Sequence, residues 1–181
     1  MKRKIILKGF HRPLSIIPPF MRSVVKPGKN KIDMRTYIFT DSCRYRLDGG
    51  DQFDWNKLYG YCYGMDGIHK NSGRIVWRYN PNTDKIELAA YCYDNDIRVY
   101  QLLGEVNIDE QILVSVEVMD NIIKMSLVGV YNNDKLDTTK GNTFKMEFNE
   151  SLKDKFKFSC DLYFGGNRVA PHQINVLYDK Y

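Results

Sequence analysis

Alanine is almost missing from this chain, which has only Ala89, Ala90 and Ala170 among its 181 residues. Alanine is the best helix former, and the 13 tyrosines favour strands, so the composition predicts a β-rich protein. No stretch approaches the roughly 20 apolar residues of a membrane span. The apolar run after the basic start, Ile5 to Leu7, is shorter than a signal peptide requires. We therefore expect no export signal and a protein that is cytoplasmic or assembled in a virion.

Motifs for metal binding and disulfide formation are also lacking. The four cysteines form no Cys-x-x-Cys pair, which argues against both a zinc site and a small disulfide framework. We expect reduced thiols, buried in the core where they lie within strand-like runs. The three histidines are too far apart to suggest a metal motif. These residues are Cys43, Cys62, Cys92 and Cys160, and His11, His69 and His172.

Catalytic motifs are equally scarce. No serine lies in a Gly-x-Ser-x-Gly elbow, and the glycine pairs at 49–50 and 165–166 are typical of turns rather than of phosphate-binding loops. Glycoside hydrolysis needs two carboxylates that flank one bond. Glu117 and Asp120 would point to opposite faces of a strand, so they cannot form such a pair. The residues alone therefore predict no enzyme and no cofactor.

The positive charge is concentrated in residues 1–35. They hold ten Lys or Arg and one acid, a net charge of +9, whereas the remainder holds 17 basic and 21 acidic residues, a net charge of −4. Four of the six prolines also lie there, which disfavours helix and central strand. We predict an extended basic arm over 1–35 that binds a protein partner, a second copy or its own domain; nucleic acid is a secondary reading. Its predicted contact residues are Leu14, Ile16, Ile17, Phe20 and Met21, an apolar patch around Pro18-Pro19.

From about Met34 onward, apolar residues alternate with polar ones, as in half-buried strands. The alternation is strongest over 155–164, and similar runs recur near 36–40, 58–64, 73–79, 86–92, 97–103, 112–118, 123–127, 144–148 and 173–178. Turns rich in Asn and Asp separate several of these runs, and such residues tolerate the positive φ of tight hairpins. The pattern predicts one all-β domain over 36–181, an antiparallel two-sheet β-sandwich or jelly roll.

A set of Tyr, Arg and Glu residues falls on alternate positions of three central strands. Aromatic rings stack on sugar faces, and Arg and Glu hydrogen-bond hydroxyls or carboxylates, so the set could bind a glycan. It could equally bind protein, since Tyr and Arg are favoured at interfaces, or it could be core or covered by loops. The candidate ligand-binding residues are Tyr59, Tyr61, Arg74, Arg78, Glu87, Tyr91 and Tyr93.

The closing segment Leu162-Tyr-Phe-Gly-Gly-Asn-Arg-Val-Ala-Pro-His172, with the strand Gln173 to Tyr178, resembles the last hairpin of concanavalin-A-like and laminin-G-like sandwiches. The blocks 73–79 and 85–91 are similar to uncharacterised proteins of Bacteroides-type bacteria and tailed phages. The resemblance implies a jelly roll with a concave face for carbohydrate or protein. Some polysaccharide lyases of this fold use Arg, Gln, His and Tyr there, and Arg74, His69 and Tyr163 match part of that set. The usual Gln-Ile-His is Gly67-Ile-His69 here, and the Tyr-x-Lys pattern is absent.

Three functions follow in order of preference. The first is a non-enzymatic structural or binding module, a tailed-phage virion component that docks on neighbouring proteins through its arm. The second is a carbohydrate-binding, lectin-like module that uses the Tyr/Arg/Glu face. The third is a polysaccharide lyase of atypical site.

Overall fold

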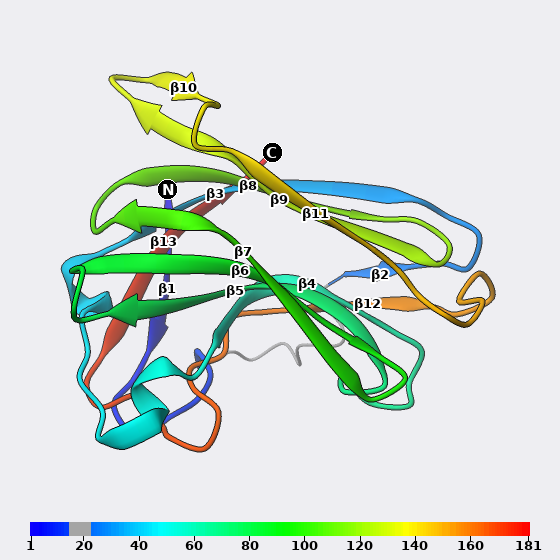
Figure 1. Ribbon diagram of the computed structural model, residues 1–181, viewed down its shortest axis with the longest axis horizontal. Helices are drawn as coiled ribbons and strands as arrows, with labels where there is room; N and C mark the ends of the chain where they lie inside the picture. The colour runs from blue at the N-terminus through cyan, green and yellow to red at the C-terminus, as the bar shows by residue number, and fades with distance from the viewer. Residues whose placement is uncertain (15–22) are drawn as a thin grey trace.

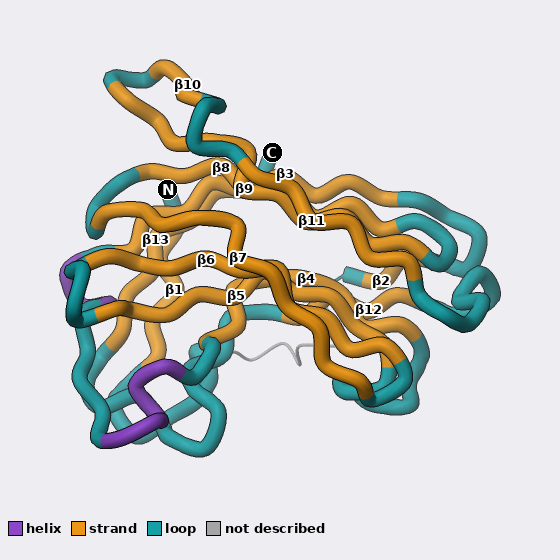
Figure 2. The backbone as a smooth tube through the Cα atoms, in the orientation of Figure 1, coloured by secondary structure: helices purple, strands orange, loops and turns teal. Residues whose placement is uncertain are grey.

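The computed structural model describes residues 1–14 and 23–181 (Figure 1). Its strands are β1 (Lys2–Ile6), β2 (Val24–Val25), β3 (Lys31–Phe39), β4 (Asn56–Tyr63), β5 (Asn71–Asn80), β6 (Lys85–Asp94), β7 (Ile97–Asn107), β8 (Gln111–Val118), β9 (Ile122–Asn132), β10 (Lys135–Asp137), β11 (Asn142–Glu147), β12 (Lys157–Cys160) and β13 (Ile174–Lys180). Two short 3-10 segments, η2 (Asp41–Cys43) and η3 (Gly49–Phe53), lie outside the two layers of strands (Figure 2).

The strands form two sheets stacked face to face. The first sheet has the order β1-β13-β3-β8-β9-β10, with β11 also paired to β9, and the second has the order β2-β12-β4-β5-β6-β7. Every pairing between named strands is antiparallel. The predicted all-β sandwich is therefore confirmed.

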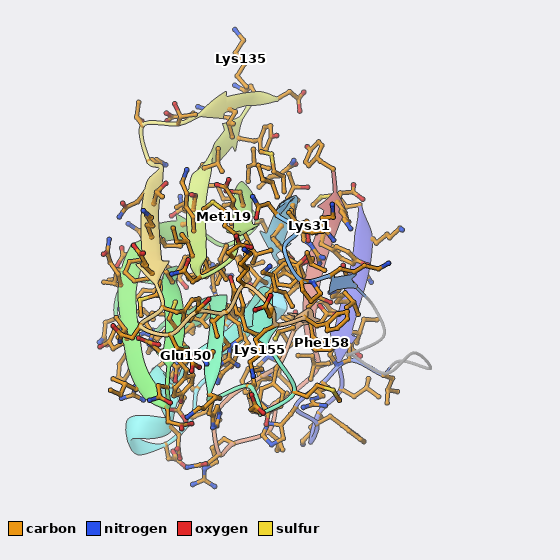
Figure 3. The ribbon with its side chains drawn as sticks, turned by 90° about the vertical axis from the view of Figure 1, so that its right-hand side faces the viewer. Lys31, Met119, Lys135, Glu150, Lys155 and Phe158 are labelled. Carbon is orange, nitrogen blue, oxygen red and sulfur yellow. The ribbon has the colours of Figure 1, made fainter. Side chains whose placement is uncertain are left out.

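The core fills the space between the two sheets, as the side chains in Figure 3 show. Trp77 is fully buried at its centre, with its ring centroid 5.1 Å from that of Phe39 in the opposite sheet. Several tight turns between strands use Asn or Asp at positive φ, as the sequence indicated, among them Asp84, Asn95 and Asn133. Alternating strands and Asn/Asp turns thus account for most of the architecture.

The described parts of residues 1–35 contribute strands to both sheets of the sandwich. β1 pairs with β13 over five residue pairs, and the first and last strands lie side by side in Figure 1. β2 pairs with β12, and β3 already begins at Lys31. The predicted boundary at residue 35 therefore falls inside β3. The described strands before it, β1 and β2, each pair with the edge of a sheet.

The predicted contact residues of the arm are only partly visible. Leu14 is 70% exposed. Ile16, Ile17, Phe20 and Met21 lie outside the described residues. Binding of a partner by this segment stays a prediction. In the described part of the chain, no helix has the length and apolar character needed to cross a membrane.

Candidate functional site

The outer face of the second sheet carries most of the predicted ligand-binding residues. Arg74 of β5 pairs with Tyr91 of β6, and Arg78 pairs with Glu87 four residues along the same strands. Tyr93 follows on the same face. Next to them, a small apolar cluster that is buried and separate from the core forms the floor of this face. The cluster consists of Trp55, Val76, Ala89 and Tyr91, with Tyr93 packed against it.

Tyr59 and Tyr61 lie on the opposite, inner face, so their predicted place beside Arg74 is wrong. Their hydroxyls are 2.8 Å apart, and both donate to the carboxylate of buried Asp33. The two tyrosines face inward because the small residues of β4, which alternate with them, face outward. A Cβ at Gly60 would lie 2.6 Å from the Cα of Arg74, so only glycine lets Arg74 lie across this strand.

A cavity of about 620 Å³ opens on this outer face. Its walls come from the start of β4 and the residues before it, β5, the second half of β6, the start of β7, the loop before β5, the end of β12 with the segment after it, and residues 12–13. Four cations line it against two carboxylates, so the cavity is electropositive. The ionisable and aromatic lining residues are Arg12, Asp54, Trp55, Lys57, His69, Arg74, Tyr91, Tyr93, Arg98, Cys160, Asp161 and Tyr163.

Arg74 is the central cation of this cavity. Its side chain is only 4% exposed, and its guanidinium carbon lies 5.5 Å from the ring centroid of Tyr91 and 6.0 Å from that of Tyr93. Among residues 1–14 and 23–181, neither Nε nor Nη2 of Arg74 has a hydrogen-bond acceptor. A buried, unsatisfied charged donor costs about 1–3 kcal/mol or more. An anionic group bound in the cavity would offset that cost.

Lys57 lies beside Arg74, and no pattern in the sequence points to it as a site residue. Burial, together with the charge of Arg74, lowers the pKa of Lys57 to about 8. Its Nζ donates to the carbonyl oxygens of Trp55 at 2.7 Å and Gly165 at 3.3 Å. A β-bulge between Lys57 and Tyr59 sets its orientation, and period-two alternation cannot predict such an irregularity. Lys57 is therefore a cation with an accessible neutral form.

Tyr163 and His69 both line the cavity. The backbone of Tyr163 exchanges two hydrogen bonds with Lys57, and Lys57 Nζ lies 5.7 Å from the tyrosine ring centroid. The ring of Tyr163 also stacks on His11 at 4.9 Å. His69 lies 4.7 Å from Tyr93 between ring centroids. The structure thus brings Arg74, His69 and Tyr163, the residues that match part of the lyase set, around one cavity.

Arg78 and Glu87 share the outer face but do not line the cavity. Arg78 Nε lies 2.6 Å from Glu87 Oε2, and the guanidinium stacks over Trp55 at 4.1 Å. Asn80 donates to the other oxygen of Glu87 at 2.6 Å. These polar groups satisfy one another, so they support the floor of the site rather than offer free groups to a ligand.

No protein-family model and no curated protein sequence matches the chain. Solved structures do match it. Alginate lyase A1-II', a member of polysaccharide lyase family 7, aligns at 12% identity with a TM-score of 0.51, over 86% of this chain and 64% of the lyase. Alginate lyase AlyC3 aligns at 10% identity with a TM-score of 0.54, over 86% and 66%. The fold is a concanavalin-A-like jelly roll. This chain therefore spans about two thirds of the length of each of these lyases.

The same comparison corrects two predictions. The solved structures that match this fold include several alginate lyases, and this finding contradicts both the preference for a non-enzymatic structural module and the prediction of no enzyme. The enzymatically active domain of a tailspike protein from bacteriophage CBA120 also aligns, at 12% identity over 86% of this chain and 23% of that one. Its TM-score of 0.43 supports no argument about a virion role. The identities are low, so the shared feature is the fold.

Proposed function

We propose that this protein is a polysaccharide lyase that cleaves an acidic, uronate-containing polysaccharide by β-elimination. The observation that carries the proposal is Arg74 at the wall of an electropositive cavity, a buried cation with two guanidinium nitrogens that have no acceptor among the described residues. The matching fold of the alginate lyases supports it. Each uronate sugar carries a carboxylate, and an electropositive cavity favours such an anion.

Arg74 has the role of binding the substrate carboxylate and neutralising its charge. A proton on the carbon next to a carboxylate is hard to remove, because negative charge accumulates on the carboxylate as the proton leaves. A fixed positive charge in a partly dehydrated site stabilises that accumulating charge. Arg98, which lines the same cavity, adds to the field. These cations take the place of the amide group that is missing at Gly67.

Lys57 and Tyr163 are our candidates for proton transfer. The neutral amine of Lys57 removes the proton next to the carboxylate, the electron pair forms a carbon–carbon double bond, and the glycosidic carbon–oxygen bond breaks. The hydroxyl of Tyr163 gives its proton to the leaving oxygen. A base works best when its pKa lies near the working pH, and the pKa of Lys57 at about 8 meets this condition.

The aromatic floor would bind the sugar rings on either side of the cleaved bond. Trp55 and Tyr91 line the cavity, and aromatic rings stack on the carbon–hydrogen faces of sugars. The floor would therefore provide affinity, while the cations provide selectivity for acidic chains.

The test is an ultraviolet assay for unsaturated uronate product on a panel of polysaccharides. We expect product from at least one acidic polymer and none from neutral ones. Arg74→Ala and Lys57→Met should each lower kcat/KM by at least about 100-fold, because each removes a group that acts in the transition state. Arg44→Ala is the matched control, since Arg44 is an exposed cation paired with Asp84 and lies away from the cavity.

Two outcomes would contradict the proposal. If no acidic polymer yields product, or if Arg74→Ala is as active as the wild type, the lyase assignment is wrong. Binding of an acidic oligosaccharide without product, lost in Arg74→Ala, would instead assign the cavity to a glycan-binding module.

A further inference from the structure

Two of the four thiols lie side by side at the edge of the cavity. In the pairing of β12 with β4, Phe158 is opposite Cys62 and Cys160 is opposite Gly60, so the two cysteines are diagonal neighbours on the outer face. Figure 3 labels the residue Phe158. Its carbonyl oxygen lies 3.6 Å from the sulfur of Cys62 and 3.8 Å from that of Cys160. Cys160 also lines the cavity.

The two thiols differ in accessibility and acidity. Cys62 is half-buried, and its pKa is lowered to about 7 by the hydrogen bond from the Cys160 thiol and by the charge of Arg74. Cys160 is 8% exposed, and the hydrogen bond to Cys62, together with burial, raises its pKa well above the usual range. At neutral pH, Cys62 is a nucleophile and Cys160 is a protonated neighbour.

The other two cysteines provide an internal contrast. Cys43 and Cys92 are fully buried in the core between the sheets. Burial raises the pKa of Cys92 to about 12. A thiol without access to solvent and without thiolate character is inert toward small oxidants.

We propose that Cys62 and Cys160 form a reversible redox pair that reacts with low-molecular-weight disulfides of the glutathione type. The Cys62 thiolate attacks one sulfur of the small disulfide, whose sulfur–sulfur bond breaks and releases one thiol. Cys160 then loses its proton and attacks the Cys62 sulfur, which expels the second small thiol. Two protein thiols are oxidised by two electrons, and the small disulfide is reduced to two thiols.

The strand geometry makes the resulting bond reversible. Diagonal neighbours in an antiparallel pair have Cα atoms about 7–8 Å apart, whereas disulfides favour Cα separations of about 4.4–6.8 Å. Closing the bond must therefore shift β12 along β4 at this point, and a strained disulfide is reduced more easily. The chain that follows Cys160 forms one wall of the cavity, so this cross-link also tightens that wall.

The test treats the full-length reduced protein with oxidised glutathione and maps its cysteines by mass spectrometry. We expect a Cys62–Cys160 disulfide, loss of two of the four free thiols, and recovery of both with a reductant. In Cys160→Ser, the reaction should stop at a stable glutathione adduct on Cys62. In Cys62→Ser, Cys160 should acquire no adduct. Cys92→Ser is the matched control and should react as the wild type does.

Three results would contradict the proposed redox pair. They are a wild-type protein that keeps four free thiols, a glutathione adduct that persists on wild-type Cys62, and equal adduct formation in both single variants. Circular dichroism of each variant separates these results from misfolding, and Cys160→Ala provides a second replacement. The assay uses no polysaccharide, so its outcome is independent of the proposed lyase activity.

Discussion

Asp33 is the buried acid that accepts the hydrogen bonds of the inward-facing tyrosines of β4. It is 3% exposed and accepts hydrogen bonds from Tyr59 and Tyr61, while Lys31 and Lys180 each lie 3.4 Å away. Burial alone would raise the pKa of Asp33, but the two hydroxyls and the two lysines outweigh it and lower the pKa to about 2. The negative charge is therefore part of the folded structure.

This cluster predicts an acid-dependent loss of stability. Because the folded pKa of Asp33 lies below its ordinary value of 3.8, its ionised form contributes about 2 kcal/mol above pH 4, and this contribution is lost as the pH falls toward 2. Urea unfolding of the wild type should show that loss. Asp33→Asn should be less stable at pH 7 and should lose less stability between pH 4 and pH 2.

Asp154→Asn is the control for this experiment, because Asp154 is an exposed acid with no partner among the described hydrogen bonds and ion pairs. It should retain the wild-type pH profile. An Asp33→Asn protein whose stability falls over this range as steeply as the wild type's would show that Asp33 is not the titrating group.

At the residue scale, the sequence identified Arg74, Tyr91 and Tyr93 correctly as members of one face. Their strands alternate without interruption, and alternation is the property that a sequence displays. Tyr59 and Tyr61 were misplaced because alternation defines two faces without saying which is buried. A run of Tyr against Gly and Cys resembles an aromatic binding face, and only the position of Asp33 in another strand shows that the hydroxyls have a buried partner.

At the element scale, β12 shows the same limit more sharply. The strongest alternation in the chain lies here and predicts that Phe156 and Phe158 face the core. The structure reverses it: Lys157 is fully buried, with Nζ donating to the Lys29 carbonyl at 3.1 Å, while Phe156 is 47% exposed. The register with β4 decides, because Lys157 pairs with the inward-facing Tyr63. Register is a property of two strands, and one strand's pattern does not contain it.

Truncations in β12 test this orientation directly. Lys157→Ala should destabilise the protein by about 2 kcal/mol or more, because it leaves a void between the sheets and an unsatisfied carbonyl at Lys29. Phe156→Ala, just before β12, should cost under about 1 kcal/mol, since about half of the residue's surface is already exposed. Chemical denaturation measures both variants. The opposite ranking would mean that β12 presents its phenylalanines to the core, as the alternation predicts.

At the scale of the whole molecule, the two-sheet architecture was predictable and the role of the first 35 residues was not. Proline and charge indicate an extended segment, and its described parts contain strands, but two sheet edges supply pairing partners that no local pattern reveals. β1 pairs with β13 from the far end of the chain, and β2 pairs with β12. The cavity has the same origin, since segments as distant as Arg12, Lys57 and Tyr163 meet only in the folded sandwich.

A chain that begins at Met34 should therefore fail to fold as the full chain does. It lacks β1, which leaves the edge of β13 unpaired, and it lacks Asp33, which leaves the hydroxyls of Tyr59 and Tyr61 buried without their acceptor. Each unsatisfied hydroxyl costs about 1–3 kcal/mol, a large part of the 5–15 kcal/mol that typically stabilises a domain. We expect lost cooperativity in thermal melts and aggregation by light scattering.

A full-length Lys2→Gln, Lys8→Gln variant, which lowers the charge but keeps the backbone, should melt as the wild type does. A folded monomer from Met34 with an unchanged melting temperature would instead establish residues 1–33 as a dispensable arm.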